Sequence, residues 1–277
     1  MRVALPSLLG GSLTLLLLLG GCGFFTQRPE SIPPAKELYQ KGESDLDQGR
    51  FDQARINFRR VFERHPESPL APRARFLMGE TYYREAQFDK AMKEFEAFMS
   101  FYPGHPIADL VQYRMAMSYY DQMKPVEQDQ ALTQKALEQF KKLVKEYPQS
   151  RYATEALGKM EICRGRLAQK ELWVASYYAK QGNLVGARQR IQGLLKDHAG
   201  TLVVPEALYL RAEIDAQEGQ TDEAVKTFRQ LADEYSYTEW GRRAAERLTV
   251  TAQAGTDQIK PEPGLLEGLL NRLLYAR

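Results

Sequence analysis

Hydrophobic residues recur at helical spacing along most of the chain, and one such pattern is repeated. The sequence MGETYY occupies positions 78–83, and MAMSYY occupies positions 115–120, 37 residues further on. In both copies a small residue, Gly79 or Ala116, is followed three and four positions later by tyrosines. A period of this length is typical of proteins that stack one supersecondary unit on the next.

A second pattern follows each first helix and occurs five times. A small residue, which lets two helices approach closely, is followed four positions later by a large apolar residue that can fill the space between repeats. Prolines then end the second helix of the first three copies. The small residues are Ala54, Ala91, Ala136, Ala187 and Ala224, the large ones Phe58, Phe95, Phe140, Ile191 and Phe228, and the prolines Pro66, Pro103 and Pro148.

The two patterns together match the tetratricopeptide repeat, a helix-turn-helix of about 34 residues. The sequence therefore predicts an all-α solenoid domain over 36-253. Gly49, Gly182 and Gly219 stand where first helices end, a place that favours a left-handed residue. The proline-free stretch 151-180 predicts a long helix that joins two repeats. We expect about five repeats, at 36-66, 69-103, 106-148, 152-199 and 203-236, and a capping helix at 239-252.

The N-terminus has the three parts of an export signal: a basic start, an apolar stretch at 8-19 and small residues before Cys22. This arrangement resembles the lipobox of bacterial lipoproteins. We expect 1-21 to be a signal peptide, Cys22 to carry a diacylglycerol and an N-acyl chain, and 22-35 to be a tether. In the lipoproteins it resembles, Gly rather than Asp after the cysteine implies the outer membrane. An uncleaved anchor or a secreted protein are the alternatives.

The C-terminal residues 254-277 read as a linker followed by a short amphipathic helix. Pairs of leucines begin at Leu265 and recur every four residues, which places them on one helical stripe. A helix this short is not stable alone, so we expect it to dock. The solenoid itself, a partner protein and the membrane surface are the three candidate docking sites.

Charge and reactive residues favour a binding protein over an enzyme. The 277 residues carry a net charge of only +2, which gives no field for nucleic acid. Of the two cysteines, a lipidated Cys22 leaves Cys163 unpaired, and its helical context indicates a buried apolar residue. The three histidines end different repeats, without a catalytic triad, phosphate loop or metal cluster beside them. We expect no catalysis, no metal and no cofactor besides the lipid.

Two stretches resemble the BamD family of outer-membrane assembly lipoproteins. They read LAQKELWVASYY at 167–178 and ARQRIQGLL at 187–195, and the resemblance extends over about residues 18–236. It implies a scaffold on the periplasmic face of the outer membrane, within the β-barrel assembly machinery. The implied partners are a BamA-like β-barrel protein, bound through its last periplasmic domain, other lipoproteins of the complex, and unfolded outer-membrane proteins. The leucine-rich tail is not a general feature of this family.

Aromatic residues are expected to line a concave groove, because the fifth and twelfth positions of each first helix face it in this fold. Outer-membrane proteins typically end in an aromatic-rich strand, whose alternating side chains such a groove could hold. We expect Phe76, Tyr83 and Tyr120 in particular to bind these C-termini, whereas Tyr82 and Tyr119 belong mainly to the core. The alternative is that the rings fill gaps between repeats. The predicted groove residues are Tyr39, Phe76, Tyr83, Tyr113 and Tyr120.

Arginines on the second helix of repeat four are the expected contact with the BamA-like partner. The resemblance implies that Arg190 binds a carboxylate there, with Arg188 and Lys196 beside it. Alternatively, these residues form a charged helix face that is exposed to solvent and binds no partner. For the whole chain, the alternative function is a general periplasmic repeat lipoprotein that serves envelope or cell-division complexes.

Overall fold

The computed structural model describes residues 32–253 and, beyond them, 259, 262, 264, 265 and 268. Within these residues it consists of eleven α-helices without a β-strand. All of them belong to one compact unit that begins at Pro34. The predicted all-α repeat fold is confirmed. The predicted signal peptide, Cys22 and most of the tether lie outside the described residues, as does most of the leucine-rich tail.

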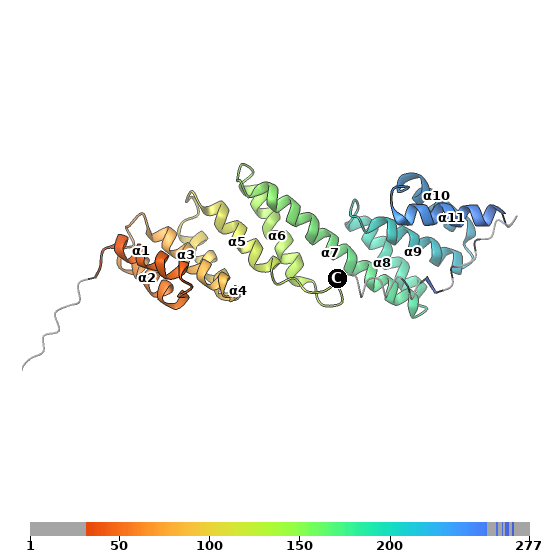
Figure 1. Ribbon diagram of the computed structural model, residues 1–277. Helices are drawn as coiled ribbons and strands as arrows, with labels where there is room; N and C mark the ends of the chain where they lie inside the picture. Colours follow the sequence, from red (N-terminus) through yellow and green to blue (C-terminus); the bar gives the residue numbers. More distant parts are fainter. Residues whose placement is uncertain (1–31, 254–258, 260–261, 263, 266–267, 269–277) are drawn as a thin grey trace, which may run out of the picture. The chain divides into compact units, whose positions relative to one another are not determined.

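Ten of the helices form five consecutive pairs, joined within each pair by a short connection (Figure 1). Each pair corresponds to one predicted repeat, and the second helix of each pair also packs on the helix that follows it. The eleventh helix, α11 (Glu239–Gln253), packs on α10 and α9, where the capping helix was expected. The pairs are α1 (Ala35–Asp47) with α2 (Phe51–Arg64), α3 (Ala71–Arg84) with α4 (Phe88–Phe101), α5 (Ala108–Tyr120) with α6 (Ala131–Glu146), α7 (Ala153–Lys180) with α8 (Leu184–Asp197), and α9 (Val204–Gln217) with α10 (Thr221–Glu234).

Within a pair, a small residue on the first helix lies against the large apolar residue of the second. A methyl group added to Gly79 would lie 2.5 Å from the ring of Phe95, and one added to Gly42 would lie 2.6 Å from Phe58. Both rings are fully buried and have no room to move. The small residues therefore set the distance between the two helices, as the sequence pattern indicated.

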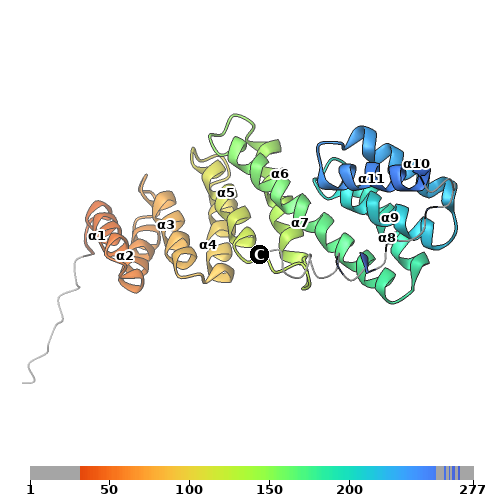
Figure 2. The same ribbon diagram turned by 45° about the vertical axis from the view of Figure 1, so that its right-hand side comes forward.

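The helix α7 joins the third pair to the fourth. It runs for 28 residues, and Figure 2 shows it beside both α6 and α8. Its N-terminal half contributes Ala156 and Cys163 to a core with Phe140, while Leu172 and Ala175 belong to the next core. The long helix predicted over 151-180 is thus confirmed. None of the described helices is both long enough and apolar enough to cross a membrane.

Cys163 is a packing residue, as its sequence context indicated. It is fully buried, and its sulfur lies 3.8 Å from the sulfur of Met123. Burial raises the pKa of the Cys163 thiol to about 11, because the thiolate would lose its hydration. The thiol therefore stays protonated at neutral pH and is a poor nucleophile.

Four of the five connections between paired helices contain a residue with positive φ, whereas the longer connection from α5 to α6 has none. Gly49, Gly182 and Gly219 have φ values of 71°, 77° and 76°, which confirms the prediction for these glycines. The second pair has Ala86 at the same place, with φ 55°. A side chain in the left-handed region costs about 1–2 kcal/mol relative to the right-handed one, so this turn carries strain that the glycine turns avoid.

Exchanging alanine and glycine at these two turns should change stability in opposite directions. We expect Ala86→Gly to stabilise the chain and Gly49→Ala to destabilise it, each by about 1 kcal/mol. No atom lies within 4 Å of a methyl group added to Gly49, so the cost there is conformational. Urea unfolding of the chain from residue 23 onward, which lacks the predicted signal peptide and the lipidated cysteine, measures both.

Gly158, in the middle of α7, provides the control for this pair. An added methyl group meets no atom within 4 Å there either, and the residue is helical. Gly158→Ala should therefore stabilise by about 0.5–1 kcal/mol. If Gly49→Ala stabilised the chain as Gly158→Ala does, the conformational explanation would be wrong.

Candidate functional site

The most accessible of the predicted groove residues are Tyr83 on α3 and Tyr120 on α5. Both rings are half-buried. The Tyr83 ring contacts Phe88 edge-on at 5.6 Å, and its hydroxyl donates a hydrogen bond to Asp121. The Tyr120 ring contacts Phe140 edge-on at 6.0 Å. Each ring is thus held by the core and remains partly exposed.

Two cations lie over these rings. The guanidinium of Arg114 is 5.2 Å from the centre of the Tyr83 ring, and the ammonium of Lys159 is 4.4 Å from that of Tyr120. Each arrangement is a cation–π contact. We name the four residues, Tyr83, Arg114, Tyr120 and Lys159, the aromatic–basic surface. It offers apolar ring area and positive charge together, which suits an aromatic peptide that carries a carboxylate.

Arg114 is fixed by a carboxylate on the neighbouring first helix. Its Nε lies 2.7 Å from an oxygen of Glu80, whose side chain is only 7% exposed, while that of Arg114 is 30% exposed. Burial raises the pKa of Glu80, and the charge of Arg114 opposes that shift. The pair joins α3 to α5 and leaves part of the guanidinium accessible.

Tyr39, Phe76 and Tyr113 do not line an open groove, which corrects the expectation from the sequence. Their exposed fractions are 7%, 7% and 5%. The Tyr113 ring stacks on Tyr152 at 5.0 Å, and its hydroxyl donates to Glu155 at 2.5 Å. These positions point toward the next pair of helices, and the rings fill the space between repeats. Tyr82 and Tyr119 pack partly buried against the same cores.

Sequence reasoning missed Arg114 and Lys159 as members of a site. Charged residues are frequent on helices, and neither stands in a motif. One signal could have found Arg114: it lies 34 residues after Glu80, three short of the 37-residue offset between these two first helices, which is about one helical turn earlier on the neighbouring helix. Opposite charges at that spacing can form a pair between repeats.

The two arginines of α8 occupy different environments. Arg188 donates to Asp215 at 2.7 Å and also pairs with Glu218, so it joins α8 to the end of α9. Asp215 is only 3% exposed, and burial raises the pKa of its carboxyl. Arg188 is therefore engaged within the chain, which leaves less of it for a partner than the sequence suggested.

Arg190 is the more accessible arginine. Its side chain is 46% exposed and lies 3.2 Å from a carboxylate oxygen of Glu171 on α7, itself 31% exposed. An exposed pair of this kind contributes about 0–1 kcal/mol to stability. Arg190 can therefore exchange Glu171 for a carboxylate of another protein at little cost to the fold.

Acidic residues, histidines and cysteines do not gather into a metal site in the described part of the chain. His198 directly follows α8, and His105 lies in the connection from α4 to α5. Burial lowers the pKa of both imidazoles, which favours their neutral form.

Replacing the two α8 arginines one at a time should show that Arg188 stabilises the fold and that Arg190 contributes little to it. Arg188→Ala leaves the buried Asp215 without its closest partner and should lower the free energy of unfolding by about 1–3 kcal/mol. Arg190→Ala should change it by less than about 1 kcal/mol. Urea unfolding of the two variants measures the difference. Equal losses of stability would show that Arg190 is as much a part of the fold as Arg188.

Comparison with known proteins gives one consistent result. The family model YfiO, described as outer membrane lipoprotein, matches residues 33–231. The chain is 29% identical to the outer membrane protein assembly factor BamD of Caulobacter vibrioides, over 79% of this chain and 73% of that one. It is 27% identical to BamD of Rickettsia prowazekii, over 85% and 94%.

Among solved structures, the chain is similar to a tetratricopeptide repeat protein from Parabacteroides merdae. The identity is 17%, the TM-score is 0.38, and the match covers 87% of this chain and 86% of that one. The family model, by contrast, covers most of the helical pairs described above. The chain therefore belongs to the YfiO family of outer membrane lipoproteins and is similar to the BamD assembly factors, as the resemblance in its sequence predicted.

Proposed function

We propose that this chain is a lipid-anchored scaffold of the outer-membrane β-barrel assembly machinery, which binds unfolded outer-membrane proteins and a BamA-like subunit. Its family and its BamD relatives support this role over that of a general periplasmic adaptor. The observation that carries the binding role is the aromatic–basic surface on successive first helices. The proposed role is binding and positioning, with no catalytic step.

The anchor in this proposal is the lipid on Cys22. Two acyl chains on a diacylglycerol, with a third on the amine, exceed the two that stable membrane anchoring requires. The residues from Cys22 to 35 would then serve as the tether between the membrane and α1, and the prolines among them would limit its flexibility. This arrangement would hold the repeats on the periplasmic face of the outer membrane.

The proposed ligand of the aromatic–basic surface is the C-terminal strand of an unfolded outer-membrane protein. Alternate side chains of an extended peptide point to one side, so aromatic residues at alternate positions of the bound strand would face the rings of Tyr83 and Tyr120. Arg114 and Lys159 lie over those rings and can pair with the terminal carboxylate. Of the five tyrosine and phenylalanine positions predicted from the sequence, only these two retain the exposure such binding needs.

The proposed contact with the BamA-like subunit is Arg190, for which a carboxylate is the natural partner. Its guanidinium is nearly half exposed and already pairs with Glu171, so its position and orientation are fixed before binding. Arg188 supports this surface indirectly by holding α8 to α9.

The substrate proposal predicts that removing two rings abolishes most peptide capture. Burying each ring contributes about 1.5–3 kcal/mol, and 1.4 kcal/mol corresponds to tenfold in affinity. Tyr83→Ala with Tyr120→Ala should therefore reduce photo-crosslinking of a peptide ending in phenylalanine by at least about tenfold. Tyr83→Phe with Tyr120→Phe keeps both rings and should retain most of the crosslinking.

A matched control removes two tyrosines elsewhere. Tyr177 and Tyr237 are 44% and 74% exposed, and their joint replacement by alanine should leave crosslinking unchanged. Circular dichroism and thermal melting establish that each variant is folded. Undiminished crosslinking in the folded Tyr83 and Tyr120 alanine variant would contradict the proposed substrate site.

A further inference from the structure

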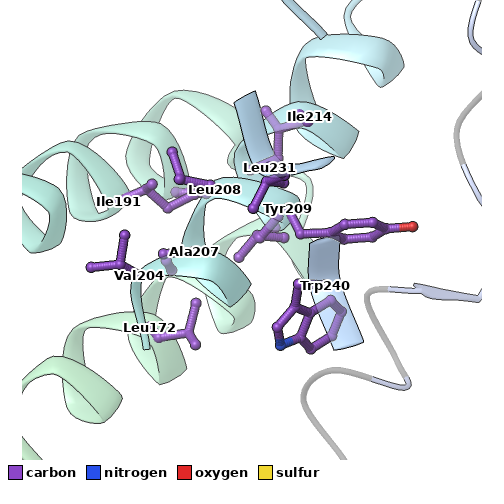
Figure 3. Close-up of a cluster of buried hydrophobic side chains, with 14 of the residues drawn as sticks. Leu172, Ile191, Val204, Ala207, Leu208, Tyr209, Ile214, Leu231 and Trp240 are labelled. Atoms are coloured by element: carbon purple, nitrogen blue, oxygen red, sulfur yellow. The ribbon is translucent and has the colours of Figure 1, made fainter. Parts of the chain in front are cut away.

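Two apolar residues beyond α11, Ile259 and Leu265, pack on the last pair of helices. Ile259 and Leu265 are 3% and 7% exposed and belong to the same core as Tyr209 and Trp240. Figure 3 shows this core from Leu172 to Trp240, with the Tyr209 hydroxyl pointing away from the labelled aliphatic side chains. That hydroxyl contacts the carboxylate of Glu262.

Glu262, midway between the two apolar residues, is held by both flanking helices. Its carboxylate accepts a hydrogen bond from the Tyr209 hydroxyl on α9 at 2.9 Å, and two from Arg243 on α11 at 2.8 and 3.0 Å. Its backbone N–H donates to Glu213 at 2.9 Å. Glu213 in turn accepts from Arg247 at 3.0 Å. Both the side chain and the backbone of Glu262 are therefore recognised.

One part of this arrangement recurs from an N-terminal repeat. Glu213 lies nine residues after the start of α9, as Glu80 does after the start of α3, and each pairs with an arginine 34 residues further on, on α11 and α5 respectively. On α9 and α11, Glu213 also accepts the backbone N–H of Glu262.

We propose that the face of α9 and α11 is a peptide-binding site, and that the chain fills it with its own Ile259, Glu262 and Leu265. The ligand class is a segment with one carboxylate side chain and an aliphatic residue three positions before and after it. Ile259, Glu262 and Leu265 have this spacing. The site and its occupant belong to the chain's own C-terminal segment, so the inference does not depend on the proposed substrate or partner.

The charges of the site explain why a carboxylate is selected. Arg243 lies 5.1 Å from the ring centres of both Tyr209 and Trp240, so its cation is partly removed from water. Glu262 forms the close ion pair with Arg243, at 2.8 Å. The carboxylate of Glu239, the other acidic residue beside Arg243, is 4.0 Å from its guanidinium. A positive side chain in place of Glu262 would meet Arg243 directly and be repelled.

The sequence around Glu262 also favours binding as a preorganised segment. Pro261 and Pro263 flank it and restrict the conformations that the free segment can adopt. Less conformational entropy is then lost on docking. Because a short tether gives an effective concentration of about millimolar, a dissociation constant at or below that value suffices for occupancy within the chain.

The test uses the full-length Cys22→Ser chain and a fluorescent peptide of residues 256–268, titrated to about 1 mM. Glu262→Lys should release the segment and open the site. We expect the peptide to bind this variant at least about tenfold more tightly than the wild-type chain. A peptide with the same lysine should not bind either chain. Glu246→Lys, the same charge change at an exposed position of α11, should behave as wild type.

Two further measurements keep the result interpretable. Thermal melting establishes that Glu262→Lys is folded, and if it is not, Glu262→Gln, which removes the charge without reversing it, takes its place in the titration. Hydrogen exchange of α11 should accelerate in the releasing variant and slow again when peptide is added. Equal peptide binding to the wild-type and releasing variants, or no binding to the folded releasing variant, would overturn the proposal.

Discussion

The close contact between a small residue of each first helix and a large side chain of its partner is the interaction on which the structure depends. Gly79 against Phe95 shows it most directly, since even a methyl group would overlap the ring. This contact fixes the distance between paired helices, and the next pair then packs on both. Side chains on the exposed side of the first helices consequently recur at equivalent places from one repeat to the next.

Two places on these helices share a similar charge pair. On α3 and α5, Glu80 and Arg114 lie beside the half-buried Tyr83, and part of the arginine is accessible. On α9 and α11, Glu213 pairs with Arg247 and accepts the backbone N–H of Glu262. The second place shows in molecular detail how such a pair can hold a residue from another part of the chain. We propose that the first binds a segment of another protein.

The sequence predicted the helices and their pairing well, because apolar spacing, glycine turns and prolines are local signals. It could not separate the exposed Tyr83 from the buried Tyr113, since that difference depends on Tyr152 and Glu155 from the following repeat. Nor could it separate Arg188 from Arg190, because their partners lie on different helices. Glu262 stands in a proline-containing linker, and its contact with Tyr209 spans 53 residues. No local sequence pattern indicates a contact over that separation.

The central claim is that the first-helix face and the exposed edge of α8 bind different proteins independently. Co-purification after mild detergent extraction tests it most directly, with the native chain, Arg190→Glu, and Tyr83→Ala with Tyr120→Ala compared side by side. The account predicts that Arg190→Glu loses the BamA-like β-barrel subunit, while the double tyrosine variant retains it. Full retention of that subunit by Arg190→Glu, or its equal loss from both variants, would contradict the account.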